Sequence, residues 1–125
     1  MPDTRPITIF CDIDGTLVEH HPPNISAHPG NSLKILANTI SKLTEWDAKG
    51  YNIILTSGRK EGMRKVTEEH LAEVGIFYDQ LVLGIGGGVR YLINDRKSDG
   101  RQSAFAICCE RDGGIGEINI TNQAQ

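Results

Sequence analysis

Hydrophobic and polar positions follow one another along this chain in short blocks that predict strands and helices in turn. Apolar, β-branched runs at residues 7–10 and 51–55 are typical of buried strands. Over residues 33–46 and 60–74 the apolar positions recur at helical spacing, and a glycine follows each stretch as an expected helix end. This alternation predicts an α/β domain with a mostly parallel sheet and helices on both faces.

The second half of the chain predicts further strands. Residues 77–83, 91–93 and 104–109 are apolar runs of strand length. The glycine-rich stretch 84–88 does not fit a dinucleotide-binding loop, because Val89 stands where the third glycine would be and no helical pattern follows. We expect a turn there that lets two backbone segments approach each other closely.

Composition narrows the class of protein. The 125 residues predict a single domain over residues 1–125, with 38% hydrophobic and 23% charged residues. A net charge of −3 without a basic stripe predicts neither a nucleic-acid nor a membrane partner. The chain start lacks the layout of a signal peptide, and three cysteines suit reduced thiols better than a disulfide framework, so a cytoplasmic location is expected.

Candidate chemistry begins where the first strand ends. Asp12 and Asp14 follow the apolar run, and Gly15 and Thr16 come directly after them. Side chains at alternate positions of an extended segment point the same way, so the two acids are expected to lie together. Two like charges in one place cost stability unless a cation or a reaction needs them, although strand-end acids can also simply cap a turn.

The Asp-x-Asp-Gly-Thr pattern after a hydrophobic strand resembles the haloacid dehalogenase-like phosphohydrolase superfamily. The resemblance implies a Rossmann-like, doubly wound α/β fold. It also implies that Asp12 is the nucleophile that takes up the phosphoryl group and that Asp14 is the general acid and base. Mg²⁺ is the implied cofactor, with Asp12 and Asp14 among its ligands.

A second motif follows the next strand. Thr56, Ser57 and Gly58 form a hydroxyl-and-glycine turn at a strand end, which resembles the phosphate-binding motif of this superfamily. The spacing to Gly58 and Arg59 favours Ser57 as the phosphate-binding hydroxyl. The residue type that is commoner at this place in the superfamily favours Thr56, and the sequence leaves both open.

The remaining motifs depart from the family pattern. Asp95 follows the strand predicted at 91–93 and resembles the third metal-binding acid, with Asp99 as a further acid that acts through water or orients other ligands. The lysine expected before this strand is absent. Arg90 is the first candidate to supply its charge on position, and Lys60 or Lys65 are alternatives.

The spacing of the motifs leaves no room for a cap domain. Only a flap at about residues 16–30 is expected over the site, and His20 and His21 are either substrate contacts or solvated loop residues. Capless relatives act on large substrates or close the site with a neighbouring subunit, so a homo-oligomer is one expectation. Small capless members resembling this chain suggest a sugar phosphate of a surface-polysaccharide pathway as the substrate.

The sequence therefore predicts a Mg²⁺-dependent phosphatase that hydrolyses a small phosphomonoester through an aspartyl-phosphate. A first rival is a weak or inactive domain of the same fold that binds a phosphometabolite or a protein. A second rival is a phospho-accepting receiver domain, whose acids are normally adjacent, unlike Asp12 and Asp14. A nucleic-acid end phosphatase is a further alternative that the acidic balance does not favour.

Overall fold

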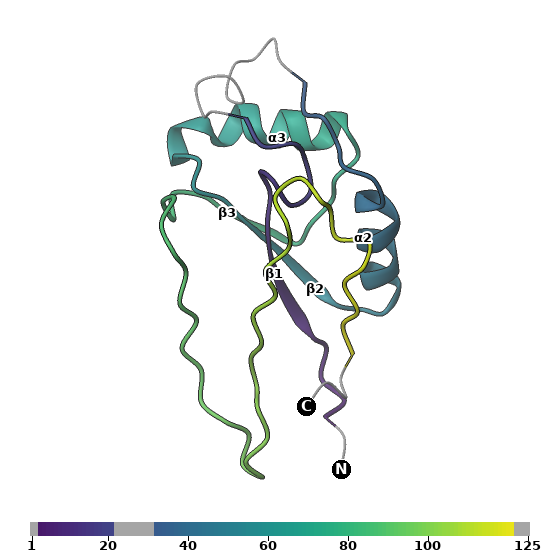
Figure 1. Ribbon diagram of the computed structural model, residues 1–125, viewed down its shortest axis with the longest axis vertical. Helices are drawn as coiled ribbons and strands as arrows, with labels where there is room; N and C mark the ends of the chain where they lie inside the picture. The colour runs from purple at the N-terminus through teal and green to yellow at the C-terminus, as the bar shows by residue number, and fades with distance from the viewer. Residues whose placement is uncertain (1–2, 22–31, 122–125) are drawn as a thin grey trace.

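The computed structural model describes residues 3–21 and 32–121, and within them a three-stranded parallel sheet forms the centre (Figure 1). Its strands are β1 (Thr8–Asp12), β2 (Asn52–Thr56) and β3 (Gln80–Val82), in the order β1-β2-β3. Parallel pairing needs a crossover between consecutive strands, and helices supply it here. The predicted Rossmann-like α/β fold is confirmed, and the described residues contain no cap domain.

Two helices connect the strands. Helix α2 (Thr39–Ala48) joins β1 to β2, and a short 3₁₀ turn η1 (Glu61–Met63) with α3 (Arg64–Glu73) joins β2 to β3. The glycines expected to end these helices do so in left-handed conformations, with φ of 78° at Gly50 and 81° at Gly75. No helix in the described part of the chain has the length and apolar character needed to cross a membrane.

The core lies on one face of the sheet. Ile9 is opposite Ile53 and Cys11 is opposite Leu55 in the strand register, and all four side chains are buried. The opposite face is more open: Phe10 is 60% exposed, although Ile54, its partner in register, is buried. Successive side chains of a strand alternate between faces, so this difference follows directly from the pleat. Both helices contribute to the one core, through Leu43, Trp46 and Leu71.

The first helix begins later than the periodicity predicted. Residues 33–36 are extended, because the chain pairs there with the segment after β1: the Glu19 N–H donates to the Lys34 carbonyl at 2.7 Å and the Leu36 N–H to the Leu17 carbonyl at 3.0 Å. The prediction of a helix from residue 33 was therefore wrong. Apolar side chains can reach the core from an extended segment as well as from a helix.

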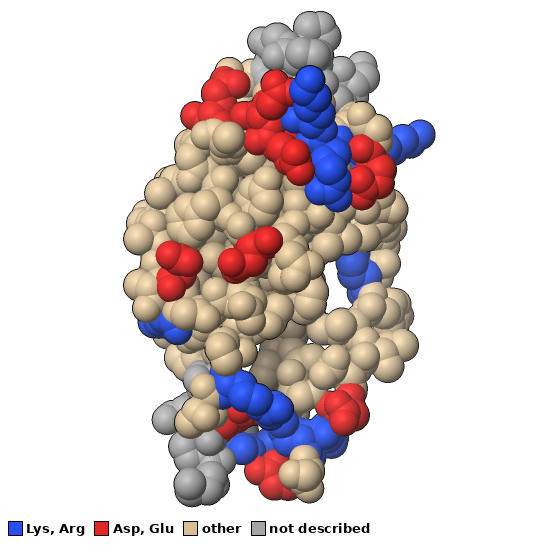
Figure 2. Space-filling model, turned by 180° about the vertical axis from the view of Figure 1, so that it is seen from behind, with Lys and Arg blue, Asp and Glu red and all other residues tan. Residues whose placement is uncertain are grey.

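The strands predicted at 91–93 and 104–109 do not form. Residues 84–112 instead leave the sheet after β3, turn near the chain's N-terminus and return past β1 (Figure 1). Tyr91 and Ile93 are 89% and 92% exposed. An open gap separates this segment from the body of the molecule in Figure 2. The apolar runs predicted strand character, but they could not show whether a sheet edge would accept these residues.

We expect the buried side of β2 to dominate stability. Leu55→Ala should lower the free energy of unfolding by about 2–5 kcal/mol, because it removes a fully buried side chain from the centre of the sheet. Urea denaturation measures the change. The control Phe10→Ala, on the exposed face, should cost less than about 1 kcal/mol. Equal losses from both variants would contradict the described core.

Candidate active site

Two acids stand at the carboxyl end of β1. Asp12 is the last residue of the strand and is opposite Thr56 of β2. Asp14 lies two residues on, in a turn that Gly15 completes with φ of 86°, a left-handed conformation that glycine adopts without strain. The Thr16 hydroxyl donates to Asp12 Oδ2 at 3.3 Å. In parallel α/β sheets ligands bind at this end of the strands.

The surroundings of Asp12 raise the pKa of its carboxyl group above the ordinary value. The largest cause is partial removal of water from the carboxylate, although the residue as a whole is exposed, and the negative charge of Asp14 adds to the effect. The Ile13 backbone, the positive charge of Arg90 and the Thr16 hydroxyl act in the opposite direction. Asp12 is thus held near other charged groups and at the edge of solvent.

Arg59 binds Asp14 through both carboxylate oxygens. Its Nε donates to Asp14 Oδ2 at 2.9 Å and its Nη2 to Oδ1 at 2.8 Å. The Arg59 side chain is only 3% exposed, and its remaining Nη1 donates to Thr67 of α3 at 3.2 Å. A planar guanidinium that meets a carboxylate in this way fixes the orientation of the acid. No role was predicted for Arg59 from the sequence, in which its only signal is its position directly after Gly58.

The structure separates the two candidate hydroxyl residues. Ser57 is buried, and its hydroxyl accepts the Arg59 N–H at 3.0 Å, so it is used inside the turn. Thr56 is partly exposed and lies on the same face of the sheet as Asp12, its partner in register.

Gly58 meets the glycine-rich turn that follows β3. A side chain placed on Gly58 would approach the Gly86 carbonyl oxygen to 2.7 Å, closer than packed atoms allow. The close backbone approach that the sequence predicted for residues 84–88 is confirmed at this point.

The three basic residues that were candidates to replace the absent lysine lie in different places. Arg90 is exposed and close enough for its charge to act on Asp12, while its own Nη1 donates to the Gly88 carbonyl. Lys60 is exposed at the beginning of η1. Lys65 lines a hollow on α3.

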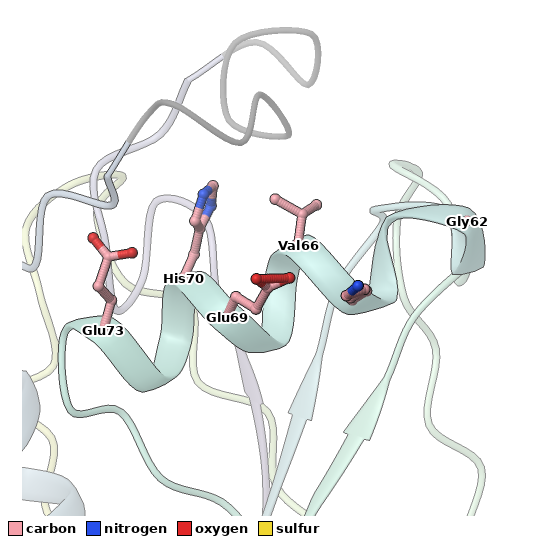
Figure 3. A pocket seen from close by; sticks show the side chains of 6 residues that line it. Gly62, Val66, Glu69, His70 and Glu73 are labelled. Atoms are coloured by element: carbon pink, nitrogen blue, oxygen red, sulfur yellow. The ribbon is translucent and has the colours of Figure 1, made fainter.

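That hollow is separate from the strand ends. It has a volume of about 370 Å³, and Figure 3 shows Val66, Glu69, His70 and Glu73 along one helix. His70 is 2% exposed, and neither ring nitrogen has a hydrogen-bond partner among the described residues. Neither Asp12 nor Asp14 lines the hollow.

Asp95 is not brought to the other two acids. Lys97, two residues after it, binds Asp3 at 2.6 Å. Asp3 precedes β1, so this part of the segment lies toward the amino end of the strand, whereas Asp12 and Asp14 lie at its carboxyl end. The strand expected to carry Asp95 to the site is the one that does not form.

A different part of the C-terminal segment reaches the first turn. The Asp112 N–H donates to the Gly15 carbonyl at 2.8 Å, and the Asp112 carboxylate accepts the His20 N–H at 2.8 Å. Asp112 was not predicted from the sequence, because no apolar pattern or motif marks it. The Nε2 atom of His21 lies 4.0 Å from Oε1 of Glu19. Most of the predicted flap, residues 22–30, lies outside the described residues.

The acids at the end of β1 supply the minimum number of protein ligands for Mg²⁺. Mg²⁺ is commonly held by one or two carboxylates together with substrate phosphate and water, and Asp12 and Asp14 provide that minimum. Asp95 does not complete the set, and Asp99 is engaged with Arg101 at 2.8 Å. In the described residues no group of three or more His, Cys, Asp or Glu side chains is arranged to hold a metal.

The fold and the site define an α/β protein with its polar groups at the carboxyl ends of parallel strands. A family model for haloacid dehalogenase-like hydrolases matches residues 9–83, which include both strand-end turns. The chain belongs to the haloacid dehalogenase-like hydrolase family. A search of curated proteins finds no match.

Solved structures share the fold of this chain. Two structures of a Pnkp1/Rnl/Hen1 complex, one of them described as an RNA repair complex, contain a chain 30% identical to this one, with TM-scores of 0.55 and 0.53. The matches cover 73% and 79% of this chain but only 32% and 30% of those chains, so it spans about a third of their length. A Vibrio cholerae protein shares the fold, at 20% identity and a TM-score of 0.50, over 73% of this chain and 81% of its own.

Loss of the Asp14 charge should destabilise the protein. Asp14→Asn leaves the buried Arg59 guanidinium without its carboxylate, and we expect the free energy of unfolding to fall by about 2–4 kcal/mol. The control Glu45→Gln removes an exposed carboxylate that pairs with Lys42 and Lys49, and it should cost less than about 1 kcal/mol. Chemical denaturation measures the free energy of unfolding of both variants. A loss in Asp14→Asn that is no larger than the loss in Glu45→Gln would refute the buried ion pair.

The charge of Arg90 should be visible in the titration of Asp12. Because a positive charge favours the ionised carboxylate, Arg90→Ala should raise the already elevated pKa of Asp12 further. Asp14→Asn removes a negative charge and should lower the pKa of Asp12. Carboxyl-carbon NMR of the metal-free protein measures both directions. An Asp12 pKa that Arg90→Ala leaves unchanged would place Arg90 too far away to act.

Proposed function

We propose that the chain is a Mg²⁺-dependent phosphatase that hydrolyses a phosphomonoester through an aspartyl-phosphate on Asp12. The observation that carries this proposal is the convergence of four groups on neighbouring strand ends. Asp12 and Thr56 are opposite each other in register, and Asp14 is fixed by Arg59. A nucleophile, a hydroxyl beside it and an oriented second acid are the groups that a covalent phosphoryl-transfer mechanism needs.

In the first step an Asp12 carboxylate oxygen forms a bond to phosphorus, and the bond from phosphorus to the leaving oxygen breaks. Asp14, which Arg59 holds as a carboxylate in the resting structure, must first take up a proton, and it then gives that proton to the leaving oxygen. In the second step water attacks the phosphorus of the acyl phosphate while Asp14 takes a proton from it, which releases phosphate and restores Asp12. Mg²⁺, when bound by Asp12 and Asp14, would supply charge that offsets the repulsion between carboxylate and phosphate.

The other residues of the site would position the phosphoryl group and offset negative charge. Thr56, which is partly exposed beside Asp12, is the better placed hydroxyl for a phosphoryl oxygen, since Ser57 is buried. Gly58 keeps that turn free of a side chain where Gly86 approaches. Arg90 acts on Asp12 electrostatically and takes the role of the absent lysine. Lys60, which is exposed at the beginning of η1, is the second candidate for that role.

We consider two substrate classes for this capless site. A sugar phosphate is our first proposal. A phosphorylated nucleic-acid end is the second, because the chains at 30% identity come from a complex described as an RNA repair complex. On the face shown in Figure 2, acidic side chains accompany the basic ones at both ends of the molecule, and no continuous basic stripe is visible. That arrangement favours the smaller substrate.

Phosphate release tests the proposal. Wild-type protein with Mg²⁺ should release phosphate from a generic aryl phosphate and from members of a panel of sugar phosphates, nucleotides and 3′- or 5′-phosphorylated oligonucleotides. Asp12→Asn should abolish release, because an amide does not replace the carboxylate nucleophile. A chelator should do the same, and added Mg²⁺ should restore activity.

The inactive alternative predicts a different result. A domain that only binds phosphometabolites would show Mg²⁺-dependent ligand binding by calorimetry, with no turnover of any compound in the panel. Activity that Asp12→Asn leaves intact would reject the aspartyl-phosphate mechanism. Stable phosphorylation of an acid other than Asp12 would point to a receiver-type function.

A further inference from the structure

The turn at residues 110–113 lies against the turn that carries the two acids. Asp112 makes two hydrogen bonds there, from its N–H to the Gly15 carbonyl and from the His20 N–H to its Oδ1, both 2.8 Å long. Packing supports the contact, because a side chain placed on Gly15 would meet Cγ of Arg111 at 3.3 Å. The family match ends at residue 83, so this contact comes from a part of the chain beyond it.

Asp112 has an unfavourable backbone conformation that its contacts maintain. Its φ of 63° lies in the left-handed region, which is unfavourable for a residue other than glycine, although Asp and Asn tolerate it better than other residues. The same conformation directs the N–H to Gly15 while the carboxylate reaches His20. Strained residues of this kind persist where the surrounding contacts over-determine them.

The contact reaches the proposed nucleophile through one peptide group. The Gly15 carbonyl bound by Asp112 belongs to the same peptide plane as the Thr16 N–H, which donates to the Ile13 carbonyl at 3.2 Å. That plane is therefore held at both ends. Thr16 in turn places its hydroxyl on Asp12 Oδ2 at 3.3 Å. A shift of this peptide would move the hydroxyl that orients the Asp12 carboxylate.

We propose that Asp112 is a positioning residue that clasps the Asp12–Thr16 turn and the residue His20 that follows it. Its N–H fixes the Gly15 peptide and so the orientation of Asp12 through Thr16. Its carboxylate fixes the backbone at His20, where the chain leaves the site. The consequence for catalysis rests on the proposed function, in which Asp12 is the nucleophile, whereas the clasp itself does not.

Three substitutions at position 112 distinguish the effects of its two hydrogen bonds. Asp112→Asn keeps an oxygen acceptor and tolerates the left-handed backbone. Asp112→Gly keeps the N–H in place and removes the acceptor. Asp112→Ala removes the acceptor and disfavours the backbone conformation as well. Asp47→Ala, an exposed position on α2, is the matched control.

Amide hydrogen exchange of the full chain, followed by NMR, tests the clasp without reference to activity. Loss of the acceptor should speed exchange at His20 by about tenfold in Asp112→Ala and Asp112→Gly, because an opened hydrogen bond exposes the amide. The amide of residue 112 should stay protected in Asp112→Gly and lose protection in Asp112→Ala. Asp112→Asn and Asp47→Ala should match the wild type. Unchanged exchange at His20 in Asp112→Ala would overturn the proposal.

Steady-state kinetics with the aryl phosphate and Mg²⁺ test the catalytic consequence. Asp112→Ala should lower kcat by about tenfold with KM within about twofold of the wild type, since it misplaces the nucleophile rather than a binding group. Asp112→Asn should restore kcat. Wild-type kcat in Asp112→Ala, or no rescue by Asp112→Asn, would overturn the positioning role. A wild-type protein without turnover would instead refute the proposed function, and the exchange result would still decide the clasp.

Discussion

The ion pair between Arg59 and Asp14 joins the turns that follow β1 and β2. Each turn leaves the sheet from a neighbouring strand, and the guanidinium reaches from one to the other with contacts of 2.8 and 2.9 Å. Without it, Asp12 and Asp14 would place two negative charges at one strand end with little to offset them. The same guanidinium binds Thr67, so helix α3 also takes part in fixing the second acid.

Charge at the site is divided between a buried and an exposed pair. Arg59 is buried and engages Asp14 directly, whereas Arg90 is exposed and acts on Asp12 through space. A direct bidentate contact fixes geometry, while a more distant charge changes the pKa of the carboxyl group without fixing its position. Under the function we propose, this division suits a second acid that keeps one orientation beside a nucleophile that binds and releases phosphate.

The site also depends on residues far along the chain. Residues 84–112 add no strand to the sheet, yet the segment comes back to the first turn, where Asp112 contacts Gly15 and His20. Beyond that turn, Ile115 is fully buried and the Ile118 carbonyl accepts Lys42 Nζ at 2.9 Å. The C-terminal segment is thus packed against the α/β body, and the family match to residue 83 does not include all that shapes the site.

The sequence by itself determined the local elements and the first two motifs. Strand patterns bounded by acids or hydroxyls located β1, β2 and the turns after them, because hydrophobic periodicity and the residues at a strand end are properties of neighbouring positions. Tertiary structure decided what depends on distant pairing: that residues 33–36 are extended, that residues 91–93 stay outside the sheet, and that Asp112 rather than Asp95 reaches the Asp12–Thr16 turn. A strand forms only where an edge accepts it, and an ion pair such as Arg59–Asp14 exists only after two strands have aligned.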